Sequence, residues 1–136
     1  MNYWLVKFAP FRFSWQKALL NGCFEIYSVR NPQSRNNLRA MQLNDRVLFY
    51  HSQVDHAVMG IMKVIREARQ DPTTSDTRWV SVTFEPVKTF ARPVLLKQIK
   101  TIPELQNITL IKQPRVSVMT LSKIEFDLIV SLSILE

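Results

Sequence analysis

The chain has 136 residues, of which 46% are hydrophobic and 21% charged, and its formal net charge is +7. A chain of this length buries roughly two-thirds of its unfolded surface, and this composition excludes an intrinsically disordered protein. No apolar run reaches the roughly 18 residues of a membrane-spanning helix, and the charges of Lys7 and Arg12 in the first apolar stretch argue against a signal peptide.

The positive charge is concentrated in the first half of the sequence. Residues 1–69 contain ten Lys or Arg and four Asp or Glu, which gives +6 and leaves +1 for residues 70–136. Most of these cations are arginine, whose planar guanidinium suits bidentate and stacked recognition. This charge favours a nucleic-acid partner, but charge alone leaves open a mildly basic protein without such a partner.

The first half alternates between expected strands and short helices. The expected strands are residues 2–8, 24–29, 46–51 and 57–68, and the expected helices are 15–21 and 34–41. Ser14 and Ser34 are the predicted N-caps of the two helices. Arg35 and Arg39 lie four residues apart and should share a helical face. Gly60 interrupts a strand pattern, which predicts a bulge or a close backbone approach.

The second half begins with a strand pattern and ends with a helix. The expected elements are a strand over 78–87, a short helix within 92–105, extended segments at 108–111 and 115–119, and a final helix from 123 to 132. Pro86 predicts the end or edge of the first of these strands, and Pro93 and Pro103 should limit the short helix. Ser122 and Glu125 have the spacing of a capping box at the start of the final helix.

These elements predict a single α+β domain over residues 1–136. About five or six strands with short helices around them favour a small, partly closed mixed β barrel.

The residues offer little for catalysis or cofactor chemistry. His51, His56 and Cys23 do not make up the ligand set of a zinc site. Two glycines, Gly22 and Gly60, cannot build a phosphate-binding loop. No nucleophile is paired with a base, so we expect no enzyme activity, no metal and no cofactor.

Residues 29–52 read VRNPQSRNNLRAMQLNDRVLFYHS and combine planar polar groups with an aromatic strand. Amides can match the edge of a base, and arginine can contact phosphate or stack. Extruded bases are held in this way against aromatic rings. The alternative is structural, with the aromatic residues in the core and Asn31 and Asn36 tying the loop to the sheet.

Several segments together resemble a known family over nearly the whole chain. The segments are KFAP, VRNPQSRNNLRAM, DRVLFYHS, VMGIMKVIREARQDPT, RWVSVTFEPV and LIKQPRVSV. They resemble the EVE domain family of the PUA-like superfamily, which is related to the YTH domains. The resemblance implies a mixed β pseudo-barrel and a non-enzymatic reader of a modified base. The implied base is methylated or hydroxymethylated cytosine, or methylated adenine, in DNA or RNA.

The resemblance and the composition together give one set of candidate nucleic-acid-binding residues. The set is Lys7, Phe8, Ile26, Tyr27, Arg30, Asn31, Gln33, Ser34, Arg35, Asn36, Tyr50, His51, Ser52, Trp79 and Arg115.

Three places depart from the family pattern. Residues 7–10 read Lys-Phe-Ala-Pro where the family has Lys-Ser-Glu-Pro, and residues 26–28 read Ile-Tyr-Ser where it has Trp-x-Gly. Pro32 replaces a tyrosine. Phe8 or Tyr27 is then expected to supply a substitute ring for the base.

The alternative is a scaffold or protein-interaction domain that kept the fold and lost modified-base recognition. In either case we expect a monomer without membrane contact in the cytoplasm, with nucleoid association as one option.

Overall fold

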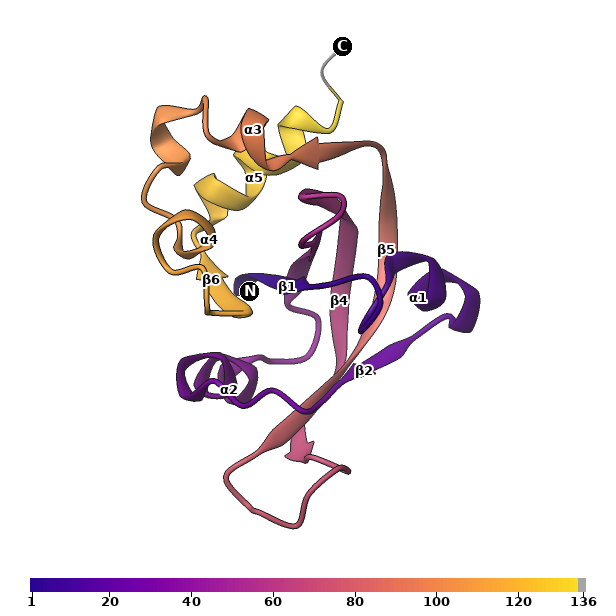
Figure 1. Ribbon diagram of the computed structural model, residues 1–136. Helices are drawn as coiled ribbons and strands as arrows, with labels where there is room; N and C mark the ends of the chain where they lie inside the picture. Colours follow the sequence, from indigo (N-terminus) through magenta and orange to yellow (C-terminus); the bar gives the residue numbers. More distant parts are fainter. Residues whose placement is uncertain (135–136) are drawn as a thin grey trace.

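The computed structural model describes residues 1–134 and contains one mixed six-stranded sheet (Figure 1). The strands are β1 (Tyr3–Phe8), β2 (Phe24–Ile26), β3 (Arg46–His51), β4 (Ala57–Gln70), β5 (Val80–Leu95) and β6 (Val118–Leu121). Their order across the sheet is β2-β5-β4-β3-β1-β6, with β1 and β3 parallel and the other neighbours antiparallel. The expected α+β fold with a mixed sheet is confirmed.

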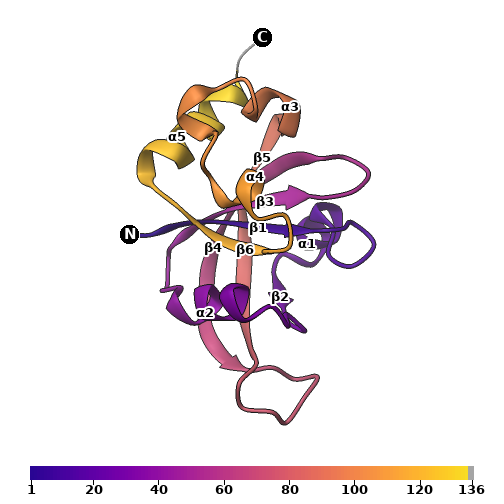
Figure 2. The same ribbon diagram turned by 60° about the vertical axis from the view of Figure 1, so that its left-hand side comes forward.

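Short helices cover the sheet from two sides. They are α1 (Trp15–Asn21), α2 (Pro32–Ala40), α3 (Leu96–Ile99), the 3-10 helix η1 (Pro103–Leu105), α4 (Thr109–Lys112) and α5 (Lys123–Leu132). Helices α3, α4 and α5 gather at one end of the molecule, while α2 lies near the other end, above the loop between β4 and β5 (Figures 1 and 2). Within residues 1–134, no helix is long and apolar enough to cross a membrane.

The two faces of the sheet carry two separate hydrophobic cores. Along β1, Trp4, Val6 and Phe8 belong to the core that also holds Trp15 of α1. Leu5 belongs to the other core, which also contains residues of β3, β4 and β5 and of the helices and connecting segments after β5. Successive side chains of a strand point to opposite faces, so the central strands are apolar at nearly every position.

Helix α2 begins earlier than the sequence predicted. Asn31, and not Ser34, is the N-cap: its Oδ1 accepts the Ser34 N–H at 2.8 Å. Pro32 occupies the first turn, where its missing N–H costs no hydrogen bond. The prediction overlooked this Asn-Pro start because Ser34 is also a good capping residue.

The predictions that β5 ends near Pro86 and that residues 108–111 are extended are wrong. The alternative for Pro86, a sheet edge, agrees with the pairing, because β2 pairs with β5 only from Val82 to Phe84. The β4–β5 ladder has an irregularity at the position where Pro86 faces Met62, so a residue without an N–H fits inside the strand. Residues Thr109–Lys112 form α4. Short apolar runs do not distinguish a strand from a buried helix.

Two local predictions are confirmed. Ser122 and Glu125 form the expected capping box, with the Glu125 N–H donating to Ser122 Oγ and the Ser122 N–H donating to Glu125 Oε1. Gly60 lies at a register shift, and a Cβ there would overlap the Lys88 carbonyl and the Trp15 ring. The glycine therefore permits the close approach of β4, β5 and α1.

We predict that Gly60→Ala lowers the free energy of unfolding, measured in urea, by about 3 kcal/mol, the upper end of the range for overpacking. Gly22→Ala is the control. A Cβ at Gly22 would meet no atom within 4 Å, so a side chain there is disfavoured only by the backbone φ of +78°. That strain should cost about 1–2 kcal/mol. A Gly60→Ala protein no less stable than Gly22→Ala would contradict the packing explanation.

Candidate functional site

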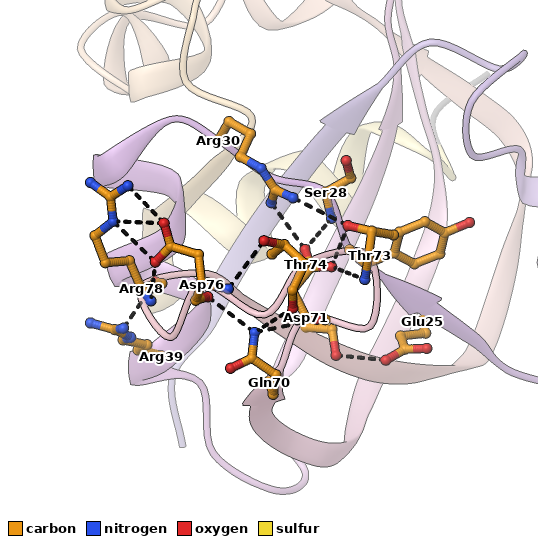
Figure 3. A network of polar contacts seen from close by, with 12 residues as sticks. Glu25, Ser28, Arg30, Arg39, Gln70, Asp71, Thr73, Thr74, Asp76 and Arg78 are labelled. Carbon is orange, nitrogen blue, oxygen red and sulfur yellow. Dashed lines mark hydrogen bonds and ion pairs between the residues drawn. The ribbon is translucent and has the colours of Figure 1, made fainter.

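A buried carboxylate connects the segment after β2 to the loop between β4 and β5. Asp71 Oδ2 accepts the Ser28 N–H at 2.6 Å and the Arg30 guanidinium at 3.0 Å (Figure 3). Asp71 Oδ1 accepts the N–H and the hydroxyl of Thr73 at 2.7 and 2.5 Å. The Asp71 side chain has no exposed surface. The four hydrogen bonds therefore compensate for its burial.

The same contacts determine the acidity of Asp71. Burial alone would raise the pKa of this carboxyl group, but the hydrogen bonds from Thr73, Ser28 and Arg30 outweigh burial and lower the pKa to about 2. Asp71 is therefore ionised at neutral pH.

Trp79 lies at the end of the loop among three arginines. The guanidinium carbons of Arg30 and Arg35 lie 5.2 Å from the Trp79 ring centroid, and that of Arg78 lies at 5.4 Å. Cations over an indole face at such distances are attracted by its quadrupole. Arg30 comes from the segment before α2 and Arg35 from α2 itself, so Trp79 joins the loop to the arginine-rich motif.

Further contacts of the loop come from α2 and from within the loop. Arg39 Nη2 donates to the carbonyls of Thr77 and Arg78 at 3.2 and 2.9 Å. Arg35 and Arg39 therefore share the predicted helical face and both reach the loop. Hydrogen bonds from the Arg78 side chain lower the pKa of the half-buried Asp76 to about 2. We call Arg30, Arg35, Arg39, Arg78 and Trp79 the arginine–tryptophan surface.

Two polar side chains of α2, those of Ser34 and Asn37, bond to β6 and the residue before it. The N–H groups of Ser117 and Val118 approach Ser34 Oγ at 3.0 and 3.3 Å, and Asn37 Nδ2 donates to the Val118 carbonyl at 2.7 Å. These bonds attach α2 to the outer edge of β6. Asn31 thus has a structural role, but as the cap of α2 and not as a tie to the sheet. The ties to the sheet come from Ser34 and Asn37, not from Asn36.

Several predicted site residues lie in the interior. The buried ones are Phe8, Ile26, Ser34, Tyr50 and His51. Burial raises the pKa of the Tyr50 hydroxyl to about 12. His51 Nε2 accepts the Trp15 N–H at 3.0 Å, and His51 Nδ1 lies 2.8 Å from Asp55 Oδ2. His51 is therefore bonded on both sides of its ring.

The other predicted site residues are at least partly exposed and lie outside the arginine–tryptophan surface. Lys7 is half-buried and its ammonium group donates to the Pro114 carbonyl; burial lowers its pKa. The Ser52 N–H donates to the Phe8 carbonyl. Tyr27, Gln33, Asn36 and Arg115 are exposed. For all of these residues, a role in binding stays a prediction.

Sequence reasoning missed Asp71 and Arg78. Asp71 lies between the expected strands 57–68 and 78–87, and Arg78 was expected only as the first residue of the second of these strands. Asp71 is 41 residues from Arg30, and no local pattern signals a contact at that separation.

In the part of the chain that the structure describes, no group of three or more His, Cys, Asp or Glu could hold a metal ion.

Comparison with known proteins agrees with this architecture. Residues 2–132 match the model of the EVE domain. The chain belongs to the EVE domain family. Mouse thymocyte nuclear protein 1 is 32% identical over 167 aligned positions, which cover 96% of this chain and 73% of the mouse protein.

Two solved structures resemble this EVE domain closely. A protein of Agrobacterium tumefaciens is 36% identical with a TM-score of 0.96, covering 99% of this chain and 94% of that one. Human THYN1, solved in complex with DNA that contains 5-methylcytosine, is 27% identical with a TM-score of 0.92. That match covers 100% of this chain and 99% of the human one.

The segment from Ile26 to Ser28, where the resemblance places Trp-x-Gly, has other side chains and one residue of positive φ. Ser28, where the resemblance places a glycine, has a φ of +61°, a conformation that costs most L-residues about 1–2 kcal/mol. Ile26, in place of the tryptophan, is completely buried. The exposed ring of this segment is Tyr27, which is 37% exposed.

We predict that Asp71→Asn reduces the free energy of unfolding at pH 7 by about 2 kcal/mol. This value follows from the difference between the pKa of Asp71 in the folded protein, about 2, and the pKa of an unfolded aspartate, about 3.9. A lowered pKa stabilises the fold above the unfolded value. The wild type should therefore lose this stability as the pH falls from about 4 through 2, and its advantage over the variant should shrink. Urea titrations at several pH values measure this.

Asp127→Asn is the control for Asp71→Asn. Asp127 pairs with Lys123 across one turn of α5 and is 55% exposed, so its loss should change stability by less than about 1 kcal/mol. A difference between wild type and Asp71→Asn that stays constant from pH 5 to 2 would contradict the role of Asp71.

Proposed function

We propose that this EVE domain is a non-enzymatic binding module for nucleic acid that recognises a modified base. The observation that carries the proposal is the arginine–tryptophan surface, where three guanidinium groups surround Trp79. The likeness of the whole chain to human THYN1, solved with DNA containing 5-methylcytosine, supports the same conclusion. The net charge of +7 is consistent with an anionic partner.

The arginines of this surface differ in their freedom to contact phosphate. Arg30 is held by the ionised, buried Asp71, so it keeps the motif in place and its guanidinium is largely committed. Arg35 is bonded through Nε to the Asn36 side chain at 3.1 Å, which leaves its terminal nitrogens to a ligand. Arg78 is 68% exposed and pairs with Asp76. We assign Arg35 and Arg78 to the phosphates and Trp79 to stacking or packing against the sugar.

Base recognition requires groups that are not already bonded. The Asn31 side-chain oxygen caps α2. Gln33 and Asn36 are exposed on α2. The Asn36 oxygen already accepts from Arg35 Nε, so we assign the Gln33 amide and the Asn36 amide nitrogen to a base edge. The proposed base is methylated or hydroxymethylated cytosine, or methylated adenine, in DNA or RNA. A monomer and a cytoplasmic location stay predictions.

One observation favours a different function, that of a scaffold which kept the fold without its ligand. Ile26 and Phe8 depart from the family pattern, and both are buried in the core that α1 covers. An aliphatic residue in the core adds no ring to a base pocket. On this alternative, no modified oligonucleotide binds better than its unmodified counterpart, and binding partners persist after nuclease treatment.

The first test uses fluorescence anisotropy with a labelled duplex that contains 5-methylcytosine, at several salt concentrations. Arg35→Gln should weaken binding and should make the slope of log affinity against log salt shallower by about 1, because one phosphate contact is lost. Unmodified duplex measured in parallel reports the preference for the modified base.

Lys97→Gln is the matched control. Lys97 is exposed on α3, at the end of the molecule away from the loop, and its loss removes the same charge (Figure 1). It should leave the slope unchanged. Equal effects of Lys97→Gln and Arg35→Gln, or a wild-type affinity independent of salt, would rule out this surface as the interface.

A further inference from the structure

Arg12 occupies a site that has the properties of a base-binding site. Its guanidinium carbon lies 5.4 Å from the ring centroid of Phe8 and 5.3 Å from that of Phe13. Its Nη2 donates to the carbonyls of Tyr27 and Ser28 at 3.2 and 2.5 Å. A planar group with N–H donors is thus held against two aromatic rings and two backbone acceptors.

The rings around Arg12 form a continuous aromatic cluster. Phe13 packs edge-on against Phe8 at 4.8 Å and against Tyr27 at 5.5 Å, and it approaches Phe24 at 6.5 Å. Phe8 and Phe13 are buried, whereas Tyr27 and Arg12 are exposed. Arg12 therefore lies between the Phe8 and Phe13 rings and the solvent.

A cavity of about 320 Å³ lies beside this cluster, between α1 and β2. Its lining includes Arg12, Lys17 and the rings of Phe13, Phe24 and Tyr27. Ligand cavities begin at about 300 Å³, which is enough for one nucleobase. The lining combines aromatic surface and two cations, which suit a nucleotide, with one carboxylate, Glu25, that accepts the Ser81 hydroxyl at 2.6 Å.

Arg12 is held by groups that an amino-substituted base could also satisfy. Among residues 1–134 it forms no ion pair with a carboxylate. The exocyclic amine of cytosine or adenine is planar with its ring and donates hydrogen bonds, so it can replace the guanidinium at the two carbonyls. The displaced Arg12 would then be free for a phosphate.

The site adjoins the arginine–tryptophan surface through one residue. Ser28 accepts a hydrogen bond from Arg12 through its carbonyl, while its N–H donates to Asp71, which also holds Arg30. A nucleic acid held at Trp79 could therefore present one extruded base to the cluster.

We propose that Phe13, Tyr27 and the carbonyls of residues 27 and 28 form a gated subsite for an amino-bearing nucleobase, which Arg12 closes in the free protein. This inference rests on the proposed function and names the residue that controls access to its base. Binding then requires the base to displace Arg12, so the observed affinity is the intrinsic affinity multiplied by the fraction of protein in the open form.

The test measures binding of the nucleoside 5-methyl-2′-deoxycytidine by NMR titration of the full chain, alongside anisotropy with the methylated duplex. Arg12→Ala should bind the nucleoside about tenfold more tightly, as expected if the closed form outnumbers the open form by about ten to one. Arg12→Lys keeps the charge but not the planar fork, and it should also bind more tightly. The uncharged nucleoside separates gating from phosphate attraction.

Two further variants complete the test. Lys97→Ala removes an exposed cation on α3, outside the cavity, and should leave the nucleoside affinity within twofold. Tyr27→Leu removes the exposed ring and should weaken it about tenfold or more. If both Arg12 variants bind the nucleoside no more tightly than the wild type, while the wild type still binds the methylated duplex, the gating proposal is wrong and the proposed function stands. Absence of duplex and nucleoside binding in every protein overturns the proposed function as well.

Discussion

The arrangement of the candidate site depends on one buried carboxylate, that of Asp71. It receives hydrogen bonds from the segment that precedes α2 and from its own loop, and it has no contact with solvent. Removing such an acceptor leaves buried donors unsatisfied, which is more costly than the net value of each bond. Because Asp71 fixes both Ser28 and Arg30, it determines where the β4–β5 loop lies and places Trp79 beneath the arginines of the motif.

The candidate site and the helices of the second half lie in different parts of the molecule. Helices α3, α4 and α5 pack at one end, and α2 with the β4–β5 loop forms the other (Figures 1 and 2). The arginine–tryptophan surface and the Arg12 cluster both belong to the α1–α2 side, and they meet at Ser28. A change in the α3–α5 end should therefore affect stability before it affects ligand binding.

Local signals in the sequence predicted much of the fold. The capping box at Ser122 and the close approach at Gly60 both require particular residue types at one position, so the sequence reveals them. The end of β5 was wrongly predicted at Pro86, because the irregularity that accommodates this proline depends on the pairing of β4 with β5 and cannot be read from the sequence of β5 alone. The ITLI run likewise became α4 because short apolar runs fit either type of element.

The candidate site was less predictable, because its contacts join distant residues. The motif indicated Arg30 and Arg35 and, by resemblance, Trp79, but nothing local connected the motif to Asp71 or to Trp79 and its neighbour Arg78. Arg12 was counted only as a charge, and its place among Phe8, Phe13 and two carbonyls depends on the turn before α1. Asn31 and Ser34 were predicted as ligand contacts, whereas their oxygens serve the α2 cap and the edge of β6.

The most direct test of the account is chemical-shift mapping of the ¹⁵N-labelled chain with a duplex that contains 5-methylcytosine at low salt. The account predicts that the largest shifts fall in residues 26–39 and 71–79, with Arg12 and Phe13 following as the base enters. Shifts that are absent from these segments, or that concentrate on α3, α4 and α5, would contradict it.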